Sequence, residues 1–219
     1  MKKIIVLGGG ADQIDLIIDL KNRGYFTILV DYYTNPIAKS YADKHIKEST
    51  LDKDKVLEIA KSENANNIIT ACTDQALLTV AYVAEKLNFQ TQFSYQQALN
   101  ITNKLHMKEM MWEANIPTSK FIKVTKLEDE FNDLKYPLMV KPADCNGSFG
   151  VRKVNDLHEL SKFFNEAAIA SRTGQVIIEE FITGKEIGID CYIDKYGKAQ
   201  ILMYGEVRKK KINENILLI

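Results

Sequence analysis

The sequence predicts an α/β fold: an N-terminal parallel sheet of the Rossmann-like kind, followed by an α+β part whose last portion is incomplete. Between residues 3 and 87, short apolar runs alternate with helical patterns. Repeated βα units of this kind build a parallel sheet that is covered by helices. From Phe121 onward the pattern changes to strands, two helices and a hairpin, which is typical of an α+β arrangement.

The composition is that of an ordinary globular chain. With 219 residues, 46% hydrophobic and 26% charged, it is long enough for one large domain or two smaller ones. Lys plus Arg and Asp plus Glu number 29 each, so we expect no nucleic-acid partner. Because no apolar run approaches the roughly 20 residues that span a bilayer, we expect no membrane association and a cytoplasmic location.

The cysteines and histidines do not form a recognisable site. They are few, far apart and without Cys-x-x-Cys or ligand-spaced His pairs. This predicts reduced thiols and no metal site among them. The residues are Cys72, Cys145, Cys191, His45, His106 and His158.

The chain is predicted to consist of three segments. Residues 1–97 are predicted as the first domain, 98–183 as a linker helix and a first lobe, and 184–219 as the start of a second lobe. The first domain is predicted to contain strands at 3–7, 25–31 and 67–71 and helices at 13–22, 53–63 and 75–87. An amphipathic helix at 98–115 follows and ends at Asn115-Ile-Pro-Thr118, because proline breaks the helical pattern.

A glycine-rich loop follows the first strand. Gly8-Gly9-Gly10 precedes a helix, which is where doubly wound folds bring backbone N–H groups to a ligand. Gly9 and Gly10 are therefore candidate substrate contacts. The dinucleotide fingerprint has Gln13 in place of its third glycine, although Asp31 ends the second strand near the place of a ribose-binding acid. The alternatives are an NAD site, or a tight turn with the acid capping the next loop.

The strand at 67–71 leads into Thr73 and Asp74. Ligands of parallel sheets bind at the carboxyl ends of strands, which makes both residues candidate substrate contacts. Both residue types are also good helix N-caps, so a purely structural role is the alternative.

The segment from Tyr136 to Val151 carries the strongest chemical signal. Lys141 ends a short apolar strand and stands before a loop with Gly147, Ser148 and Gly150. Asn146-Gly147 indicates a tight turn into a second strand at 151–154. Backbone N–H groups of such a loop and the lysine charge suit a triphosphate. The alternative is an exposed hairpin whose lysine keeps an edge strand soluble.

A helix is predicted at 127–134 and another at 156–170. A buried strand at 176–182 carries Glu179 and Glu180, which face opposite ways, so one at most points into a given pocket. Glu186 begins a polar stripe on the next strand. A turn at 194–197 leads to a strand at 199–207, and the tail at 208–219 shows no closing element. Arg208 opens a run of cations that either faces phosphate or is solvated.

Several motifs together resemble the ATP-grasp superfamily, with the carbamoyl-phosphate-synthase-like ligases as the nearest group. The resemblance covers about residues 98–208, and the preceding residues are similar to the pre-ATP-grasp domain. The motifs are Asn103-Lys104, Ile116-Pro117, residues 136–142, the 144–150 loop, and residues 178–186.

The resemblance implies a role for individual residues. Lys104 and Lys141 would contact phosphates, and the 147–150 glycines with Ser148 would close over them. Glu179 would face the adenine amino group, and Glu186 would bind the ribose hydroxyls. Glu180 and Ile182 would contact adenine through their backbones, and Arg208 would contact the γ-phosphate.

The implied reaction is formation of an acyl phosphate from ATP and a carboxylate, followed by attack of an amine or a thiol. The family uses magnesium, but no metal ligand is found in this sequence: Asn213-Glu-Asn215 has suitable residue types without the spacing. A homodimer or a complementing C-terminal fragment would then be the protein partner. The catalytic residues are not predicted.

Two other functions compete with the ligase. One is a non-catalytic nucleotide-binding partner or half of a split enzyme, with an exposed sheet edge. The other is an NAD-binding Rossmann module built on the glycine loop and Asp31, which leaves residues 136–186 unexplained.

Overall fold

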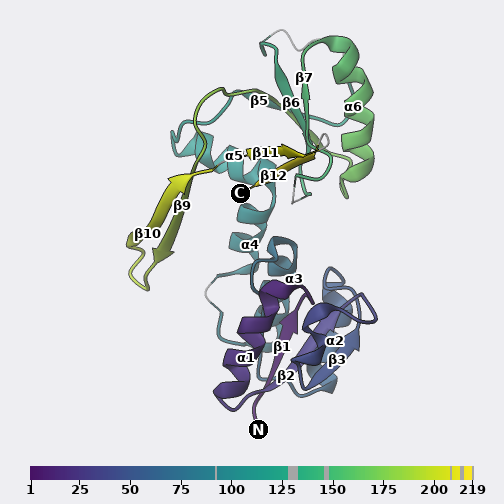
Figure 1. Ribbon diagram of the computed structural model, residues 1–219, viewed down its shortest axis with the longest axis vertical. Helices are drawn as coiled ribbons and strands as arrows, with labels where there is room; N and C mark the ends of the chain where they lie inside the picture. The colour runs from purple at the N-terminus through teal and green to yellow at the C-terminus, as the bar shows by residue number, and fades with distance from the viewer. Residues whose placement is uncertain (92, 128–132, 146–147, 208, 213–214, 219) are drawn as a thin grey trace. The chain divides into compact units, whose positions relative to one another are not determined.

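The structure is a computed structural model. It describes residues 1–91, 93–127, 133–145, 148–207, 209–212 and 215–218, the last two stretches by their backbone alone. Two compact units are distinguished by their internal contacts, Met1–Glu180 and Phe181–Ile219. Figure 1 shows the elements of each unit. The predicted boundary at residue 97 remains a prediction.

A parallel four-stranded sheet forms the N-terminal part, as predicted. Its strand order is β3-β2-β1-β4, and every pair is parallel. The sequence did not predict β3, because its residues are mostly polar; as an edge strand it pairs with β2 alone and tolerates them. The strands are β1 Lys3–Leu7, β2 Phe26–Asp31, β3 Lys44–Lys47 and β4 Asn67–Ile69.

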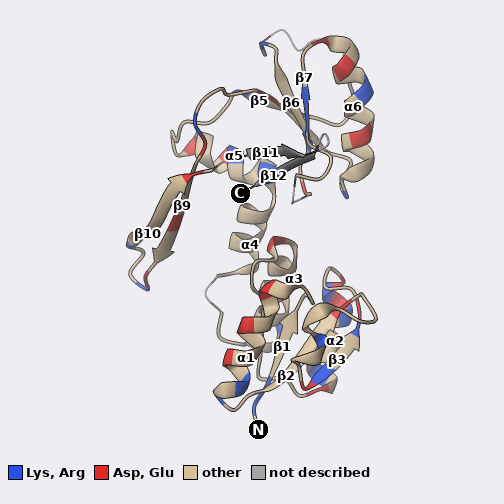
Figure 2. Cartoon of the chain, in the orientation of Figure 1, with Lys and Arg blue, Asp and Glu red and all other residues tan. Residues whose placement is uncertain are grey.

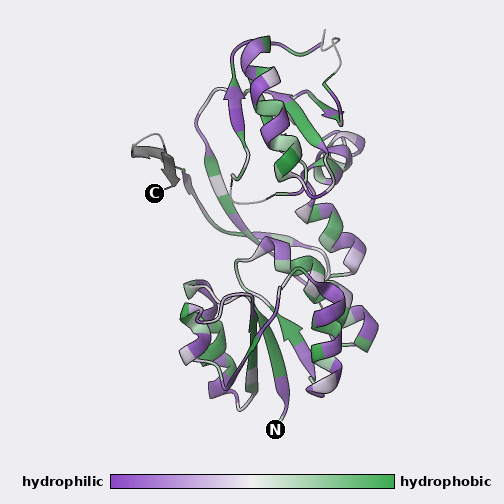
Figure 3. Ribbon diagram, turned by 90° about the vertical axis from the view of Figure 1, so that its right-hand side faces the viewer, coloured by the Kyte–Doolittle hydropathy of each residue, from purple (hydrophilic) through white to green (hydrophobic). Residues whose placement is uncertain are grey.

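Helices cover both faces of this sheet, which is why its central strands are mainly apolar (Figure 3). Ile5 and Leu7 of β1 share a core with α2 and α3, whereas Ile4 and Val6 pack on the side of α1. The helices are α1 Ile14–Asn22, α2 Lys53–Ser62 and α3 Asp74–Leu87, with 3-10 turns η1 Ala11–Gln13 and η2 Ile37–Ser40.

The predicted single helix at 98–115 is wrong. Two helices occupy this region, α4 Tyr95–Thr102 and α5 Lys104–Glu113. Asn103 separates them in an extended conformation, and its side-chain oxygen accepts hydrogen bonds from the amides of Leu105 (2.9 Å) and His106 (3.4 Å). The asparagine therefore caps a new helix, because its side chain replaces the missing intrahelical partners.

A second sheet is antiparallel, with the order β5-β8-β6-β7. Its helix α6 Leu157–Ala170 is capped by Asp156, which accepts from the Glu159 amide at 2.8 Å. The strands are β5 Phe121–Val124, β6 Leu138–Pro142, β7 Arg152–Val154 and β8 Val176–Glu180. This is the predicted α+β pattern. The predicted helix at 127–134 falls largely outside the described residues.

The two faces of this sheet differ in chemistry. Val140 and Ile178 are fully buried and pack with Leu160 and Phe164 of α6. Strand alternation sends Lys141 and Glu179 to the opposite face, where Leu105 of α5 also packs. Acidic and basic residues alternate along the outer side of α6 (Figure 2).

The two strands predicted around the Lys141 loop are present and pair antiparallel, from Leu138 with Val154 to Val140 with Arg152. Eleven residues, 141–151, separate the last paired positions, and the tight turn was predicted within this stretch. Asn146 and Gly147 themselves lie outside the described residues.

The unit Phe181–Ile219 consists of two antiparallel pairs, β9 Ile187–Ile193 with β10 Ala199–Glu206, and β11 Lys209–Ile212 with β12 Asn215–Leu218. The turn predicted at 194–197 is present, with the Gly197 amide donating to Asp194 O at 3.0 Å. In the tail, β11 and β12 form a separate two-stranded sheet, and the incomplete second lobe stays a prediction. In the described part of the chain, no helix is long and apolar enough to cross a bilayer.

Candidate active site: a lysine and glutamate cluster on the second sheet

Glu179 lies at the centre of a charged cluster on the face of the second sheet opposite α6. Its Oε2 is 2.7 Å from Lys108 Nζ, and its Oε1 accepts a hydrogen bond from Lys141. Ser119 Oγ also donates to Oε2 at 2.9 Å. Three chain segments, α5, the residues before β5, and β6, thus converge on one carboxylate of β8.

The electrostatics of Glu179 follow from these contacts. Burial by itself raises the pKa of a carboxyl group, but the hydrogen bonds and charges of Lys108 and Lys141 outweigh it, so the pKa of Glu179 lies below its ordinary value. The carboxylate is therefore ionised near neutral pH. One acid between two lysines leaves an excess positive charge, which favours an anionic ligand.

Lys108 is one of the most buried charged residues of the chain, with only 5% of its surface exposed. Its ammonium group donates to Thr118 Oγ1 and to Ser119 Oγ, both at 2.8 Å, in addition to Glu179. The ring of Phe121 lies 5.0 Å from Nζ. The desolvation of this cation is offset by hydrogen bonds for all three of its protons.

Lys104, at the first position of α5, supplies a third ammonium group. Its Nζ donates to the backbone carbonyl of Cys145, and its own amide donates to Ala143 O at 2.9 Å. Burial first, and then the nearby charge of Lys141, hold the pKa of Lys104 below its ordinary value. Lys104 and Lys141 thus lie within electrostatic range of each other, beside the loop that follows β6.

That loop is anchored by Asp144, whose carboxylate accepts from Ser171 Oγ at 2.9 Å and from the amides of Arg172 and Thr173, both at 3.1 Å. Gly150 has φ +70°, and a Cβ there would lie 2.8 Å from Pro142 Cγ. Glycine is required at this position because both backbone and space exclude a side chain. Ser148 is exposed and also has a positive φ, of 58°.

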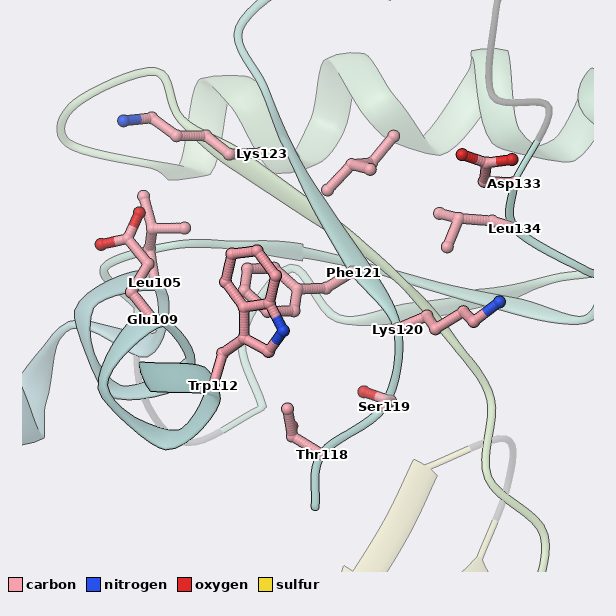
Figure 4. A pocket seen from close by; sticks show the side chains of 11 residues that line it. Leu105, Glu109, Trp112, Thr118, Ser119, Lys120, Phe121, Lys123, Asp133 and Leu134 are labelled. Atoms are coloured by element: carbon pink, nitrogen blue, oxygen red, sulfur yellow. The ribbon is translucent and has the colours of Figure 1, made fainter. Parts of the chain in front are cut away.

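A cavity of about 680 Å³ adjoins the cluster between α5 and β5. Figure 4 shows Glu109 and Trp112, which come from α5, and Lys120 and Phe121, which come from the start of β5 and the residue before it. Ser119 belongs both to this cavity and to the hydrogen bonds around Glu179. The cavity is mixed in character, with apolar rings and charged side chains of both signs.

A comparison with family models agrees with this arrangement. Residues 101–215 match the family described as D-ala D-ala ligase C-terminus, which is more than half of the chain. The chain belongs to this ATP-grasp family. The predicted resemblance to ATP-grasp proteins and the predicted fold class are confirmed.

Individual relatives of this ATP-grasp chain are distant. The carbamoyl phosphate synthase large chain of Clostridium acetobutylicum is 27% identical over 210 residues, which cover 88% of this chain and 20% of that protein. The D-alanine–D-alanine ligase of Francisella philomiragia is 28% identical over 199 residues, covering 86% of this chain and 60% of the relative.

A solved structure has the same fold. The biotin carboxylase domain of the 2-oxoglutarate carboxylase of Hydrogenobacter thermophilus, crystallised with MgADP, ADP and bicarbonate, superposes with a TM-score of 0.77 at 20% identity. The alignment covers 97% of this chain and 51% of that one. The ATP-grasp chain described here therefore spans between a fifth and three fifths of the length of these three proteins.

The glycine-rich loop of this ATP-grasp chain forms a second candidate region. Asp31 is buried, and its carboxylate accepts from the Gly9 amide at 2.7 Å and from the Tyr33 amide at 2.8 Å. These bonds correspond to the predicted capping of the loop, with one backbone amide on each carboxylate oxygen. Gly10, by contrast, is exposed. A cavity of about 540 Å³ lies here, lined by residues 8–10, 31–32, 49–51, Thr73 and Gln75.

The two candidates after β4 differ. Thr73 occupies the N-cap position of α3 but makes no side-chain cap; its hydroxyl donates to Ala71 O at 3.0 Å and accepts from Gln13 Nε2 at 3.2 Å. Thr73 therefore occupies the predicted N-cap position, but the prediction that its side chain caps the helix is wrong. Asp74 is the first residue of α3, where a carboxylate interacts favourably with the helix dipole, and it is exposed.

The remaining candidates are Glu180, Ile182, Glu186, Gly147 and Arg208. Glu180 points away from Glu179, as predicted, and its Oε1 accepts from the Lys135 amide at 3.1 Å. Ile182 and Glu186 are exposed and belong to the other unit. Gly147 and Arg208 lie outside the described residues.

Sequence reasoning missed Lys108 and Ser119. A lysine in a helix reads as solvated, and its burial depends on a carboxylate 71 positions later in the chain. The available signal was its spacing: Lys108 stands three residues after Leu105, on the same face of α5. Among the described residues, no group of three His, Cys, Asp or Glu could hold a metal ion, and no magnesium ligand is assigned.

Proposed function

We propose that this chain is the nucleotide-binding part of an ATP-dependent ligase that joins a carboxylate to an amine or a thiol. The observation that carries the proposal is the convergence of Lys141 and Lys108 on one ionised carboxylate, with Lys104 bound to the backbone of the adjoining loop, which requires glycine at position 150. The family match and the MgADP-bound structural relative support it.

The proposed roles follow from the chemistry of the side chains. Lys141 and Lys104 would neutralise phosphate oxygens, and the backbone of the 143–151 loop would donate to them. The ionised Glu179 would accept a hydrogen bond from the amino group of adenine, for which a carboxylate is a matched acceptor. Glu180, Ile182, Glu186, Gly147 and Arg208 remain proposed contacts on the basis of family resemblance.

The proposed reaction has two steps. A carboxylate oxygen of the substrate forms a bond to the γ-phosphorus while the bond from that phosphorus to ADP breaks. The amine or thiol then attacks the acyl carbon, loses a proton, and inorganic phosphate leaves. Such chemistry depends on charge neutralisation and positioning. Magnesium, which is typical of the family, would add charge neutralisation if bound.

The carboxylate substrate is proposed to bind at the glycine-rich loop, within the cavity of about 540 Å³. Gly9, Gly10 and Thr73 line this cavity, and Asp74, the first residue of α3, comes directly after Thr73. The carboxyl ends of β1, β2 and β4 meet there, which is where ligands of parallel sheets bind.

Isothermal titration calorimetry with a non-hydrolysable ATP analogue, with and without magnesium, tests the proposal. Lys141→Met should weaken binding by about 10- to 100-fold, since one charge-assisted contact is worth about 1.5–3 kcal/mol. Lys162→Met is the matched control, because Lys162 is exposed on α6, which covers the other face of the sheet. The proposal would be refuted if wild type, Lys141→Met and Lys162→Met bound the ATP analogue with equal affinity. Tight binding of NAD in place of the ATP analogue would also refute it.

A further inference from the structure

Two lysines hold Glu179, but they differ in what else they contact. Lys108 has three hydrogen-bond acceptors within 2.8 Å and a side chain that is 7% exposed. Lys141 has a side chain that is 16% exposed, and within the described residues its only recorded hydrogen bond goes to Glu179. An ammonium group has three protons, so Lys141 retains donor capacity and is the more accessible of the two.

The two lysines also approach different oxygens of the carboxylate. Lys108 and Ser119 bind Oε2, whereas Lys141 binds Oε1. Lys108, Ser119 and Glu179 form a closed ring, because Ser119 Oγ accepts from Lys108 and donates to Oε2. If Lys141 leaves, Oε2 therefore keeps a complete set of partners. Without Lys108, departure of Lys141 would leave a largely buried carboxylate with no cation, which is strongly unfavourable.

We propose that Lys108 is a positioning residue of the nucleotide site: it holds Glu179 in place while Lys141 leaves that carboxylate to bind phosphate. The inference rests on the proposed role of Lys141 in nucleotide binding. It assigns to Lys108 no contact with the nucleotide. The charged groups that face Glu179 are Lys108 from α5 and Lys141 from β6, and the segment before β5 contributes the hydroxyl of Ser119.

A double-mutant cycle on the full chain tests this role. Lys108→Met should weaken binding of the ATP analogue by about 10-fold or more. In this variant Lys141 is the last cation beside Glu179, so its departure to phosphate would leave the carboxylate without a cation. In a Glu179→Gln background the same substitution should change affinity by less than about threefold, since Lys108 acts through the carboxylate. Lys108→Arg, which keeps the charge, should retain most of the affinity.

Two outcomes would overturn the inference. One is an unchanged affinity of Lys108→Met. The other is an equal loss in both backgrounds, which would mean that Lys108 contacts the nucleotide or merely supports the fold. Circular dichroism and a melting curve for each variant establish that it is folded before its affinity is compared.

A second measurement needs no nucleotide, so it separates this inference from the proposed function. Lys141→Met imitates the departure of Lys141, and carbon-13 NMR follows the titration of the Glu179 carboxyl group, assigned by its loss in Glu179→Gln. The midpoint should stay below the ordinary glutamate value in Lys141→Met and rise in the Lys108→Met/Lys141→Met double variant. If Lys141→Met alone raises it as far as the double variant does, Lys108 does not hold Glu179.

If the wild-type chain binds no ATP analogue, the proposed function fails, and the NMR titration still decides whether Lys108 holds Glu179. If the analogue binds and the cycle shows no coupling, the inference fails and the proposed function remains.

Discussion

The strands β8 and β9 both carry isoleucines, but they place them in different environments. Ile178 of β8 is fully buried under α6, whereas Ile189 of β9 is 56% exposed. β8 is a run of three apolar residues followed by two acids, whereas β9 carries isoleucine or cysteine at every second position. β8 lies between β5 and β6 in a four-stranded sheet, and β9 pairs with β10 alone. A two-stranded sheet has too little apolar contact to be stable by itself.

The residues proposed to bind the nucleotide therefore differ in how their backbone is supported. Lys141 and Glu179 stand on paired strands whose other face is a buried core. Ile182 and Glu186, which the family resemblance assigns to adenine and ribose, precede β9 in the other unit. Lys141 and Glu179, which we propose as phosphate and adenine contacts, are thus held in place by the core of Met1–Glu180.

Matched truncations of the two strands should show the largest difference. Ile178→Ala removes a fully buried side chain and should lower the free energy of unfolding by about 2–5 kcal/mol. Ile189→Ala removes an exposed side chain and should change it by about 0.5 kcal/mol or less. Urea unfolding followed by circular dichroism measures both. Similar losses for the two variants would show that β9 is packed as firmly as β8.

A pair of glycines tests the loop after β6 against the turn between β9 and β10. Gly150→Ala should destabilise more than Gly197→Ala, by about 1 kcal/mol or more, since overpacking typically costs about 1–3 kcal/mol. Both glycines have positive φ, +70° and +79°, but a Cβ at Gly150 would meet Pro142 whereas the space around Gly197 is open. Equal melting temperatures of the two variants would contradict the close approach of Gly150 to Pro142.

The pH dependence of stability isolates the contribution of Glu179. Its pKa is depressed in the folded chain, so its contribution is present above the unfolded value of about 4.3 and is lost as pH falls through the folded pKa. The stability difference between wild type and Glu179→Gln should therefore shrink as pH decreases below about 4.3. Glu180→Gln is the control, since Glu180 has no recorded salt bridge within the described residues. An equally large pH effect for both variants would disagree with the ion pairs of Glu179.

Much of the fold could be predicted because it depends on local patterns. Alternating βα units predicted the parallel sheet, and the opposite orientation of Glu179 and Glu180 followed from strand geometry. The break at Asn103 was missed because the apolar pattern continues through it, and only a side-chain cap divides the helices. Strand β3 was missed because an edge strand needs little apolar content.

The candidate site was predictable only in part. Lys141 and Glu179 could be named from the family resemblance, but their ion pair joins strands that are adjacent only in the folded sheet. Lys108 and Ser119 carry no motif, and their importance comes from burial and from contact with a distant carboxylate. Interactions between residues far apart in the chain have no signature in one sequence.

Hydrogen exchange measured by mass spectrometry, with and without an ATP analogue or NAD, distinguishes an ATP site on the second sheet from an NAD site at the glycine-rich loop. The ATP analogue should slow exchange at residues 138–150 and 176–182, and NAD should change neither region. Protection of residues 8–13 by NAD, with no effect of the ATP analogue on the second sheet, would contradict the proposed ATP site.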